Sequence, residues 1–369
     1  MAARHGGDGS GAAAERGELP AMACDWLLVD GSSLIFRAFH GVPQSVRAGD
    51  GTPVNAVRGF LDTLARLVTR RRPARIAVAD DADWRPAWRV ELIPGYKAHR
   101  VAEPVPAALA PQLPLIREVL AAIGVEMVGR EGCEAEDLIS TWTALADGRV
   151  EVVSGDRDLF ALVEDPRVLV LYPERSGLTE VDEAEITRRY GIPGRRYADF
   201  AVLRGDPSDG LPGLRGVGAA TAAALLRRYG DLGGVAAGAG LGGAERDYLS
   251  RAQRVVRPVR DLPVRLPAGR RDAYPADPPA VAELGERLRV AEACGRLVSA
   301  LGGMGPTPPA PPGASPGTGW GSAGARHPAG PRRHGVPSGR VPFGPGGDAP
   351  KDGELALWCL PVAWEAWSE

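Results

Sequence analysis

Acidic side chains recur where predicted strands end and predicted helices begin. They are Asp30, Asp80, Asp81, Glu134, Glu136, Asp137, Asp156, Asp158, Asp206 and Asp209. Hard divalent cations such as Mg²⁺ take oxygen ligands of this kind. Two-metal phosphodiester hydrolysis needs many carboxylates, because two cations about 3.5–4 Å apart repel each other strongly. One cation lowers the pKa of the attacking water and the other stabilises the leaving oxygen, so the pattern predicts a two-metal centre.

Short spacings within this acidic set favour convergence. Asp156 and Asp158 follow a predicted strand, so both side chains can turn toward one edge of a sheet. Glu134 and Asp137 are three residues apart and share a helix face, and Glu136 lies close enough to the helix start to point the same way. A single Asp after a strand is usually a turn former or an N-cap, and acidic residues in a first turn ordinarily complement the helix dipole. Only their accumulation favours metal binding.

The elements that must position these residues follow an alternating pattern. Strands are predicted at residues 26–29, 75–79, 151–153 and 168–171, and helices between them at 55–69, 111–123 and 134–146. Such alternation predicts an α/β fold with a mainly parallel sheet and flanking helices. Open sheets of this kind bind ligands outside the carboxyl ends of their strands, where three of the predicted strands place an Asp.

After about residue 185 the pattern becomes helical, with helices predicted at 186–190, 196–203 and 219–229. A glycine-rich stretch, residues 211–218, precedes the last of them. Gly213, Gly216 and Gly218 would let backbone N–H groups approach a DNA phosphate, and the next helix presents its positive N-terminus. A helix–hairpin–helix of this kind holds the DNA backbone without reading bases. A GxG that only ends a helix needs no ligand, but Arg227 and Arg228 add positive charge.

Two segments interleave aromatic and basic residues. They contain Trp84, Arg85, Trp88, Arg89, Tyr96, Lys97, His99 and Arg100. Aromatic rings can stack on unpaired bases while Lys and Arg bind phosphates. An ordinary exposed basic loop would have the same composition, so it is the position directly after Asp81 that favours a role in binding nucleic acid.

The bulk composition is that of a soluble globular protein, with 369 residues, 44% hydrophobic and 24% charged. The formal net charge of −2 gives no global basic field, although acidic ligands can cancel a local basic patch. Cys24, Cys133, Cys294 and Cys359 lack the spacing of a zinc site. Neither a membrane span nor a signal peptide is apparent, so a cytoplasmic protein without a membrane partner is expected.

Composition also predicts the domain limits. Residues 1–22 are expected to be a disordered leader and 303–369 a disordered Gly/Pro-rich tail, since neither can bury enough apolar surface to offset its ordering entropy. The tail contains Trp358, Trp364 and Trp367, which could form a partner-binding peptide. Between them we expect an α/β core at 23–185 and a helical subdomain at 186–302.

Six successive motifs resemble those of the 5′–3′ exonuclease domain of bacterial DNA polymerase I, in that family's order. They span residues 28–40, 51–57, 95–100, 132–137, 154–159 and 205–213. The resemblance covers about residues 24–300. This family, shared with flap endonucleases, has a PIN-like α/β fold with a helical arch and a helix–hairpin–helix. Three departures stand out. Glu136 lies where bacterial members usually carry Asp, although flap endonucleases use Glu there, so the ligand role survives. Gly210 lies where Asn is usual and is expected to loosen the loop, and the Asp80–Asp81 pair leaves a one-residue ambiguity.

The resemblance implies a standalone, metal-dependent 5′–3′ exonuclease and 5′ flap endonuclease of replication and repair. It implies a monomer that acts on 5′ ends and flaps of DNA and on RNA–DNA hybrids, with Mg²⁺ or Mn²⁺ on the acidic set and K⁺ at the hairpin. Asp81 is preferred to Asp80 for its spacing from Trp84 and Tyr96. Lys97 and Arg100 would contact the scissile phosphate. Further DNA contacts would come from Arg37, Arg89, Tyr96, Gly213, Gly216, Gly218, Arg227 and Arg228.

Two other functions compete with this one. A PIN-type ribonuclease would lack both the glycine hairpin and the segment with Lys97 and Arg100. A non-catalytic DNA-binding protein would keep the fold but lose carboxylates such as Asp156 or Asp158, and both are present.

Overall fold

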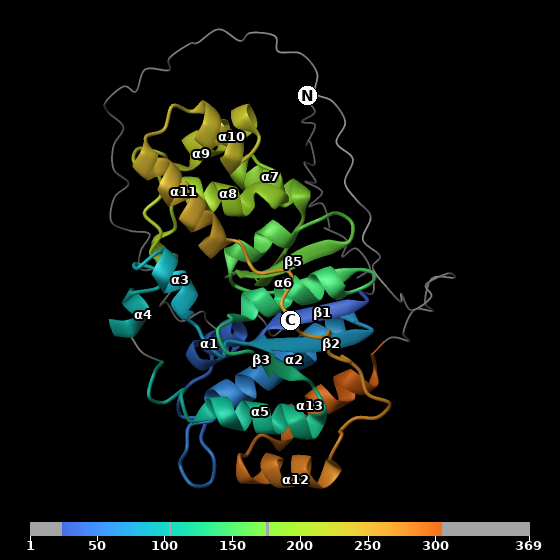
Figure 1. Cartoon of the computed structure of the whole chain (residues 1–369). Helices are drawn as coiled ribbons and strands as arrows, with labels where there is room; N and C mark the ends of the chain where they lie inside the picture. Colours follow the sequence, from blue (N-terminus) through green and yellow to red (C-terminus); the bar gives the residue numbers. More distant parts are fainter. Residues whose placement is uncertain (1–23, 103–104, 175–176, 305–369) are drawn as a thin grey trace, which may run out of the picture. The chain divides into compact units, whose positions relative to one another are not determined.

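A six-stranded sheet runs through the computed structural model, which describes residues 24–102, 105–174 and 177–304. The strand order is β3-β2-β1-β4-β5-β6 (Figure 1). The strands are β1 (Trp26–Asp30), β2 (Arg75–Asp80), β3 (Met127–Gly129), β4 (Val150–Val153), β5 (Val168–Glu174) and β6 (Gly177–Val181). Strands β1 to β5 are parallel and β6 pairs antiparallel with β5. The predicted leader and residues 305–369 of the predicted tail lie outside the described residues.

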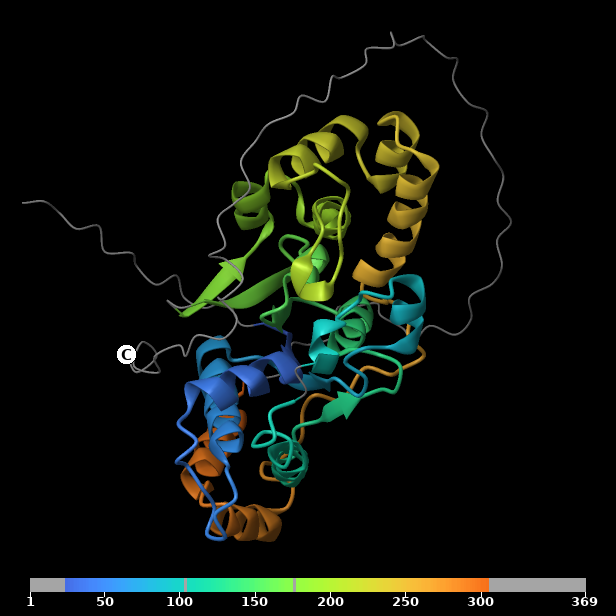
Figure 2. The ribbon, with the colours of Figure 1, turned by 90° about the vertical axis from the view of Figure 1, so that its left-hand side faces the viewer.

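Helices cover both faces of the sheet, because the connections between parallel strands place helices on its faces. Successive residues of a strand face opposite sides, so Leu28 packs into one apolar core and Leu27 and Val29 into the other. Beside Leu27 and Val29 lie α1 (Gly31–Gly41), α2 (Asn55–Arg71), α5 (Gln112–Ile123), α12 (Pro278–Arg287) and α13 (Ala291–Gly302). Figure 2 shows these helices on one side of the sheet. The predicted α/β fold class is confirmed.

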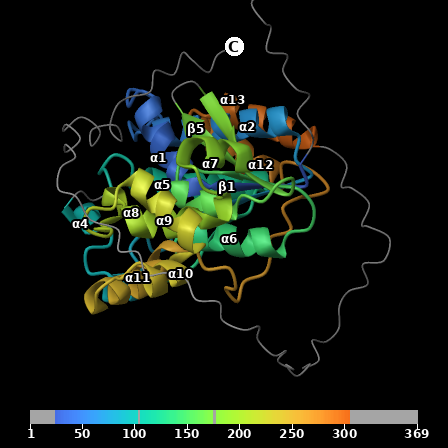
Figure 3. The same ribbon diagram turned by 90° about the horizontal axis from the view of Figure 1, so that it is seen from above.

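The opposite core is closed by the helices that follow β3 and β6. They are α6 (Ala135–Leu145), α7 (Glu183–Tyr190), α8 (Tyr197–Arg204), α9 (Ala219–Tyr229), α10 (Leu232–Gly238) and α11 (Gly243–Val256). Figure 3 shows α8 side by side with α9 and α11, which it contacts. The predicted helical arch falls on two short helices, α3 (Ala87–Leu92) and α4 (His99–Ala102).

Helices α12 and α13 pack into the core that holds Leu27, whereas α7 to α11 pack into the core that holds Leu28; the subdomain expected at 186–302 includes both groups. After α11 the chain returns past α6, where Leu262 N–H meets Thr141 Oγ1, and runs along β2, where Ile76 N–H donates to Gly269 O at 2.8 Å. Helix α13 then packs on α2 with Leu297 and Leu301 buried. Periodicity shows which helix face is apolar, but it does not show which distant surface covers that face.

No helix in the described ranges has the length and apolar character needed to cross a lipid bilayer.

Candidate metal centre

The acidic residues gather where the strand order reverses. Chain connections run from β1 outward to β2 and β3 on one side and from β4 outward to β5 on the other, so β1 and β4 are neighbours at the reversal. Ligands of open α/β sheets bind at this point, outside the carboxyl ends of the strands. Asp30 ends β1 and Asp156 follows β4, so both lie at that edge.

Three serines hold the carboxyl ends of the strands together. Ser154 Oγ donates to Asp30 Oδ2 at 2.5 Å and accepts from Asp156 N–H at 2.9 Å. Ser33 Oγ accepts from Gly155 N–H at 3.0 Å, and Ser32 Oγ accepts from Asp81 N–H at 3.0 Å. Reasoning from the sequence missed all three serines: Ser32, Ser33 and Ser154. The signal in the sequence was their place two or three residues from an acidic site residue.

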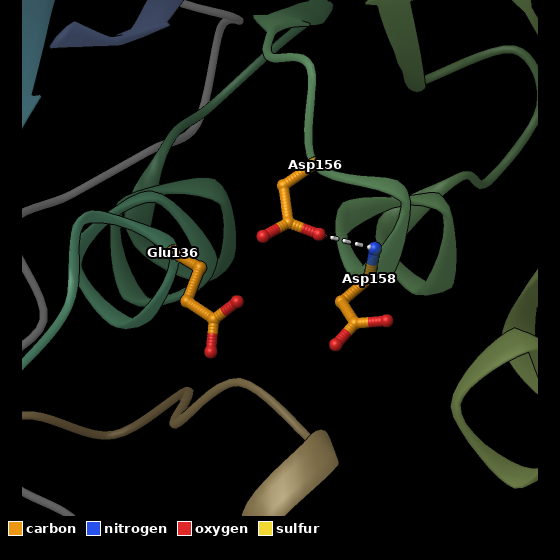
Figure 4. Close-up of side chains that lie close together, drawn as sticks. All are labelled: Glu136, Asp156 and Asp158. Atoms are coloured by element: carbon orange, nitrogen blue, oxygen red, sulfur yellow. Dashed lines mark hydrogen bonds between the residues drawn. The ribbon is translucent and has the colours of Figure 1, made fainter. Parts of the chain in front are cut away.

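Glu136, Asp156 and Asp158 point toward one another from the start of α6 and from the loop after β4 (Figure 4). Each offers one carboxylate oxygen, and these oxygens lie within 4.8 Å of one another. Glu136 Oε2 is buried and has no hydrogen-bond partner among the described residues. A buried acceptor without a donor is costly, and a cation satisfies it. The three side chains therefore fit a divalent metal ion.

Burial and the mutual repulsion of the carboxylates raise pKa values in and around this cluster. Burial, together with the charge of Asp156, raises the pKa of Glu136 to about 8 against the opposing charges of Arg89 and Lys97. Burial, together with the charge of Asp81, raises the pKa of Asp30 to about 7. Burial and the Asp156 charge hold the pKa of Asp158 well above its usual range. Carboxylates this costly to ionise indicate a site that is completed by cations.

The metal-free protein should lose stability as the pH rises from about 4 to about 8. In the folded state the pKa values of Asp30 and Glu136 are raised to about 7 and about 8, whereas in the unfolded chain they lie near about 4. The stability that their protons supply is complete below the unfolded values and is lost as the pH rises through the folded values. The melting temperature in excess chelator measures this. Glu136→Gln should flatten the profile, and a melting temperature that rises over this range contradicts the expectation.

Arg89 lies inside the acidic set. Its side chain is 0% exposed. Nη1 lies 2.7 Å from Glu136 Oε1 and also bonds Glu134, and Nη2 lies 2.7 Å from Asp137 Oδ1. Tyr96 is equally buried, and its hydroxyl donates to Glu134 Oε2 at 2.6 Å. Neither side chain is exposed, and the expected contact of Arg89 and Tyr96 with DNA stays a prediction.

Asp137 is fully engaged by the protein itself. Oδ1 accepts from Arg89 and from Val259 N–H at 2.9 Å, and Oδ2 accepts from Glu134 N–H at 3.1 Å. The last bond belongs to a capping box at the start of α6. Asp137 thus lies beside the metal cluster with both of its oxygens hydrogen-bonded to the protein.

The structure separates Asp80 from Asp81. Asp80 Oδ2 pairs with Arg117 Nη2 at 2.6 Å, and Asp80 Oδ1 accepts from Ser32 Oγ at 3.5 Å. Asp81 accepts from Ala135 N–H at 2.6 Å, and its charge acts on Asp30. Asp81, the preferred residue of the pair, is therefore the one that lies with the acidic cluster.

Lys97 lies beside the cluster with a strained backbone. Its side chain is buried, and Nζ pairs with Glu134 and lies 4.0 Å from Asp209 Oδ1. Its φ is 45°, and its N–H donates to Asp209 O at 3.0 Å. A non-glycine residue at positive φ is uncommon and persists only where its surroundings hold it.

Gly210 lets the backbone around Lys97 pack tightly, whereas the sequence predicted a looser loop at this position. A Cβ at Gly210 would lie 2.0 Å from Gly95 O, and φ at Gly210 is 71°. Only glycine lets the two backbones approach this closely. Asp209, whose pKa burial raises, thereby stays next to Lys97, and the positive charge of half-buried Arg100 also acts on it.

Asp206 lies within the field of the cluster but has local partners. It caps the turn η3 (Pro207–Asp209), accepting from Ser208 N–H at 3.0 Å, and pairs with Arg204 at 3.3 Å. Its charge contributes to the raised pKa values of Asp158 and Asp209.

In the glycine stretch between α8 and α9, two glycines are exposed and one is hydrogen-bonded to another part of the protein. Gly216 and Gly218 are exposed, and a Cβ at either would meet nothing within 4 Å in the described part of the chain. Gly213 N–H donates to Tyr248 Oη at 2.9 Å, so it is not free for a phosphate, which corrects that expectation. Arg227 and Arg228 are exposed on α9, and Arg37 is half-buried on α1.

Comparison with known proteins agrees with this geometry. The family model described as "5'-3' exonuclease, N-terminal resolvase-like domain" matches residues 25–191, and "5'-3' exonuclease, C-terminal SAM fold" matches 192–265. A "5'-3' exonuclease" of Streptomyces coelicolor is 51% identical over 276 residues, covering 67% of this chain and 92% of the relative. One of Mycobacterium tuberculosis is 47% identical over 314 residues, covering 76% and 98%.

Among solved structures, the bacteriophage T5 D15 protein co-crystallised with metal ions superposes with a TM-score of 0.54. It is 16% identical and covers 75% of this chain and 99% of its own, a likeness that shows the fold. The matched family models and relatives settle the larger question: the chain belongs to the 5′–3′ exonuclease family, whose members are nucleases.

Proposed function

We propose that this nuclease is a Mg²⁺-dependent enzyme that hydrolyses DNA phosphodiester bonds at 5′ ends and 5′ flaps by a two-metal mechanism. The observation that carries this proposal is the convergence of Glu136, Asp156 and Asp158 at the reversal of the strand order, with Glu136 Oε2 lacking a partner among the described residues. Hard oxygen ligands without His or Cys favour Mg²⁺, with Mn²⁺ as a substitute.

Glu136, Asp156 and Asp158 would hold one cation, and Asp30 with Asp81 are the candidates for a second. The charges of Asp81 and Asp156 both act on Asp30, and Ser154 Oγ bonds both Asp30 and Asp156 N–H. Bound divalent ions supply a lowered pKa for the attacking water and neutralise charge on the leaving oxygen.

The remaining groups would position the DNA. Lys97 and Arg100 lie next to Asp209 and would donate to the scissile phosphate, where negative charge grows in the transition state. Gly216 and Gly218 would bring backbone N–H groups and the positive end of α9 to a more distant phosphate. Arg37, Arg227 and Arg228 would add further phosphate contacts. We also propose K⁺ at this hairpin, activity on RNA–DNA hybrids, a monomeric state and a cytoplasmic location.

A solved relative supports the choice of substrate. A second T5 D15 structure, with a TM-score of 0.53 and 16% identity, is that of a flap endonuclease in a complex with DNA and metal ions. DNA polymerase I of Mycobacterium bovis is 43% identical over 212 residues, covering 56% of this chain and 23% of its own length. A role in replication and repair is consistent with that relative.

Cleavage of a labelled 5′-flap duplex should require Mg²⁺ or Mn²⁺ and stop in excess chelator, because the cluster consists of carboxylates. A gel assay with flap duplex, nicked duplex, RNA-primed duplex and single-stranded RNA would measure it. Adding back Mg²⁺ after chelation is the control for irreversible damage. Full cleavage in chelator would rule out the metal-dependent mechanism, and cleavage of single-stranded RNA alone would favour a ribonuclease.

A further inference from the structure

Arg89 on α3 is a buried cation that the proposed reaction does not use. The centroids of the Trp88 and Tyr96 rings lie 5.0 and 5.7 Å from Arg89 Cζ, so both rings pack near the guanidinium. Its guanidinium is shared among the acidic residues that begin α6, namely Glu134, Glu136 and Asp137. A guanidinium does not lose its proton in a protein, so this positive charge is permanent.

The bonds of Arg89 affect the carboxylate oxygens of Asp137 and Glu136 differently. Asp137 has no free oxygen, since Arg89 and two backbone N–H groups take both. Glu136 gives Oε1 to Arg89 and keeps Oε2 without a partner in the described structure. Arg89 therefore leaves Glu136 with one oxygen for the cluster with Asp156 and Asp158.

Arg89 also joins segments that are distant in the chain. Its helix α3 contacts α11, and Arg251 Nη1 donates to Leu92 O at 3.1 Å. Asp137, bonded to Arg89, accepts from Val259 N–H just after α11. The Arg89 guanidinium thus lies where α3, α6 and the segment after α11 meet, and the packing of these elements holds it in place.

We propose that Arg89 is a positioning residue that acts as a fixed internal cation: it keeps Asp137 out of the metal-binding set and limits how strongly the cluster binds divalent ions. The inference rests on the proposed metal-dependent function. A permanent positive charge a few ångströms from the cluster offsets part of its attraction for a metal ion. In exchange, it fixes Glu136 and prevents uncompensated repulsion among buried carboxylates.

Arg89→Met should give a combination of effects that loss of packing alone does not produce. The metal-free protein should melt at a lower temperature, because buried carboxylates lose their counter-charge. The Mn²⁺ concentration that gives half of the thermal shift should fall about tenfold, since one opposing charge is gone. Single-turnover cleavage at saturating metal should nevertheless slow at least about tenfold, because Glu136 is no longer held. Arg89→Lys keeps the charge and should restore the parent Mn²⁺ affinity with part of the rate.

Arg71→Met is the matched control. Arg71 likewise pairs with a buried carboxylate, Glu151, at 2.6 Å, but it does so on β4 outside the acidic cluster. This variant should lower the melting temperature and leave the Mn²⁺ concentration for half of the shift unchanged.

Asp137→Asn gives a test that leaves Arg89 in place. It removes one nearby negative charge but no metal ligand, so it should weaken Mn²⁺ affinity about tenfold, whereas Glu136→Gln removes a ligand as well and should weaken it at least about a hundredfold. If the parent shows no Mn²⁺-dependent thermal shift, the metal-dependent function itself fails. If the parent binds Mn²⁺ but Arg89→Met binds it equally or more weakly, or Asp137→Asn weakens binding as much as Glu136→Gln, the role of Arg89 is overturned while the proposed function stands.

Discussion

Asp158→Asn should lower single-turnover cleavage of a 5′-flap duplex by at least about a thousandfold, which corresponds to about 4 kcal/mol of transition-state stabilisation. Asp158 contributes one of the three converging oxygens, and the amide that replaces its carboxylate is a neutral and weaker ligand. Binding of flap DNA in Ca²⁺ should persist, because the exposed glycines and arginines that would bind phosphate are separate from the cluster. Single-turnover rates and dissociation constants measure the two effects.

The same substitution should stabilise the metal-free protein. Asp158 is 5% exposed and carries a pKa raised by burial and by the charge of Asp156, so its ionised form is costly near neutral pH. Asp80→Asn is the matched control, since Asp80 pairs with Arg117 and is not one of the three converging carboxylates. This variant should cleave at nearly the parent rate. Equal loss of DNA binding and cleavage in Asp158→Asn would mean that the cluster is structural.

The sequence predicted the edge of the sheet where the site lies because alternation and strand length fix where a strand ends. Asp30 and Asp156 follow directly from that rule. It could not decide between Asp80 and Asp81, since neighbouring residues at a strand end differ only in which side they face. A distant partner, Arg117 on α5, decides it. Strand β3 has three residues, too few for a period of two to be visible, and β6 is mostly half-buried, so no continuous apolar run marks it.

Arg89 shows a second limit of sequence-based prediction. Its neighbours Trp84, Trp88 and Tyr96 have the composition of a nucleic-acid-binding segment, and that composition gave no sign that Arg89 is buried. The partners of Arg89 begin 45 residues later in the chain, as the Arg89–Glu134 separation shows. Composition gives the charge of a side chain, but only the fold determines whether that charge faces solvent or a buried carboxylate.

Lys97→Ala should lower single-turnover cleavage about a hundredfold, equivalent to about 2.7 kcal/mol for one well-placed donor to a developing charge. Lys97 is held at the cluster by its strained backbone, by Asp209 O and by the close approach of Gly210 to Gly95. A donor fixed in this way needs little reorganisation when the phosphate arrives, so its removal should lower the rate of the chemical step. Binding of duplex DNA should change far less, because other phosphate contacts remain.

Arg227→Ala provides the contrast to Lys97→Ala. Arg227 is exposed on α9 beyond the glycine hairpin, so its loss should weaken DNA affinity and reduce the dependence of affinity on salt. Its single-turnover rate at saturating DNA should stay close to that of the parent. Rates and dissociation constants for both variants at two salt concentrations separate the two roles. If Lys97→Ala cleaves at the parent rate once DNA is saturating, Lys97 is a structural partner of Glu134 and Asp209, and its assignment to the scissile phosphate is wrong.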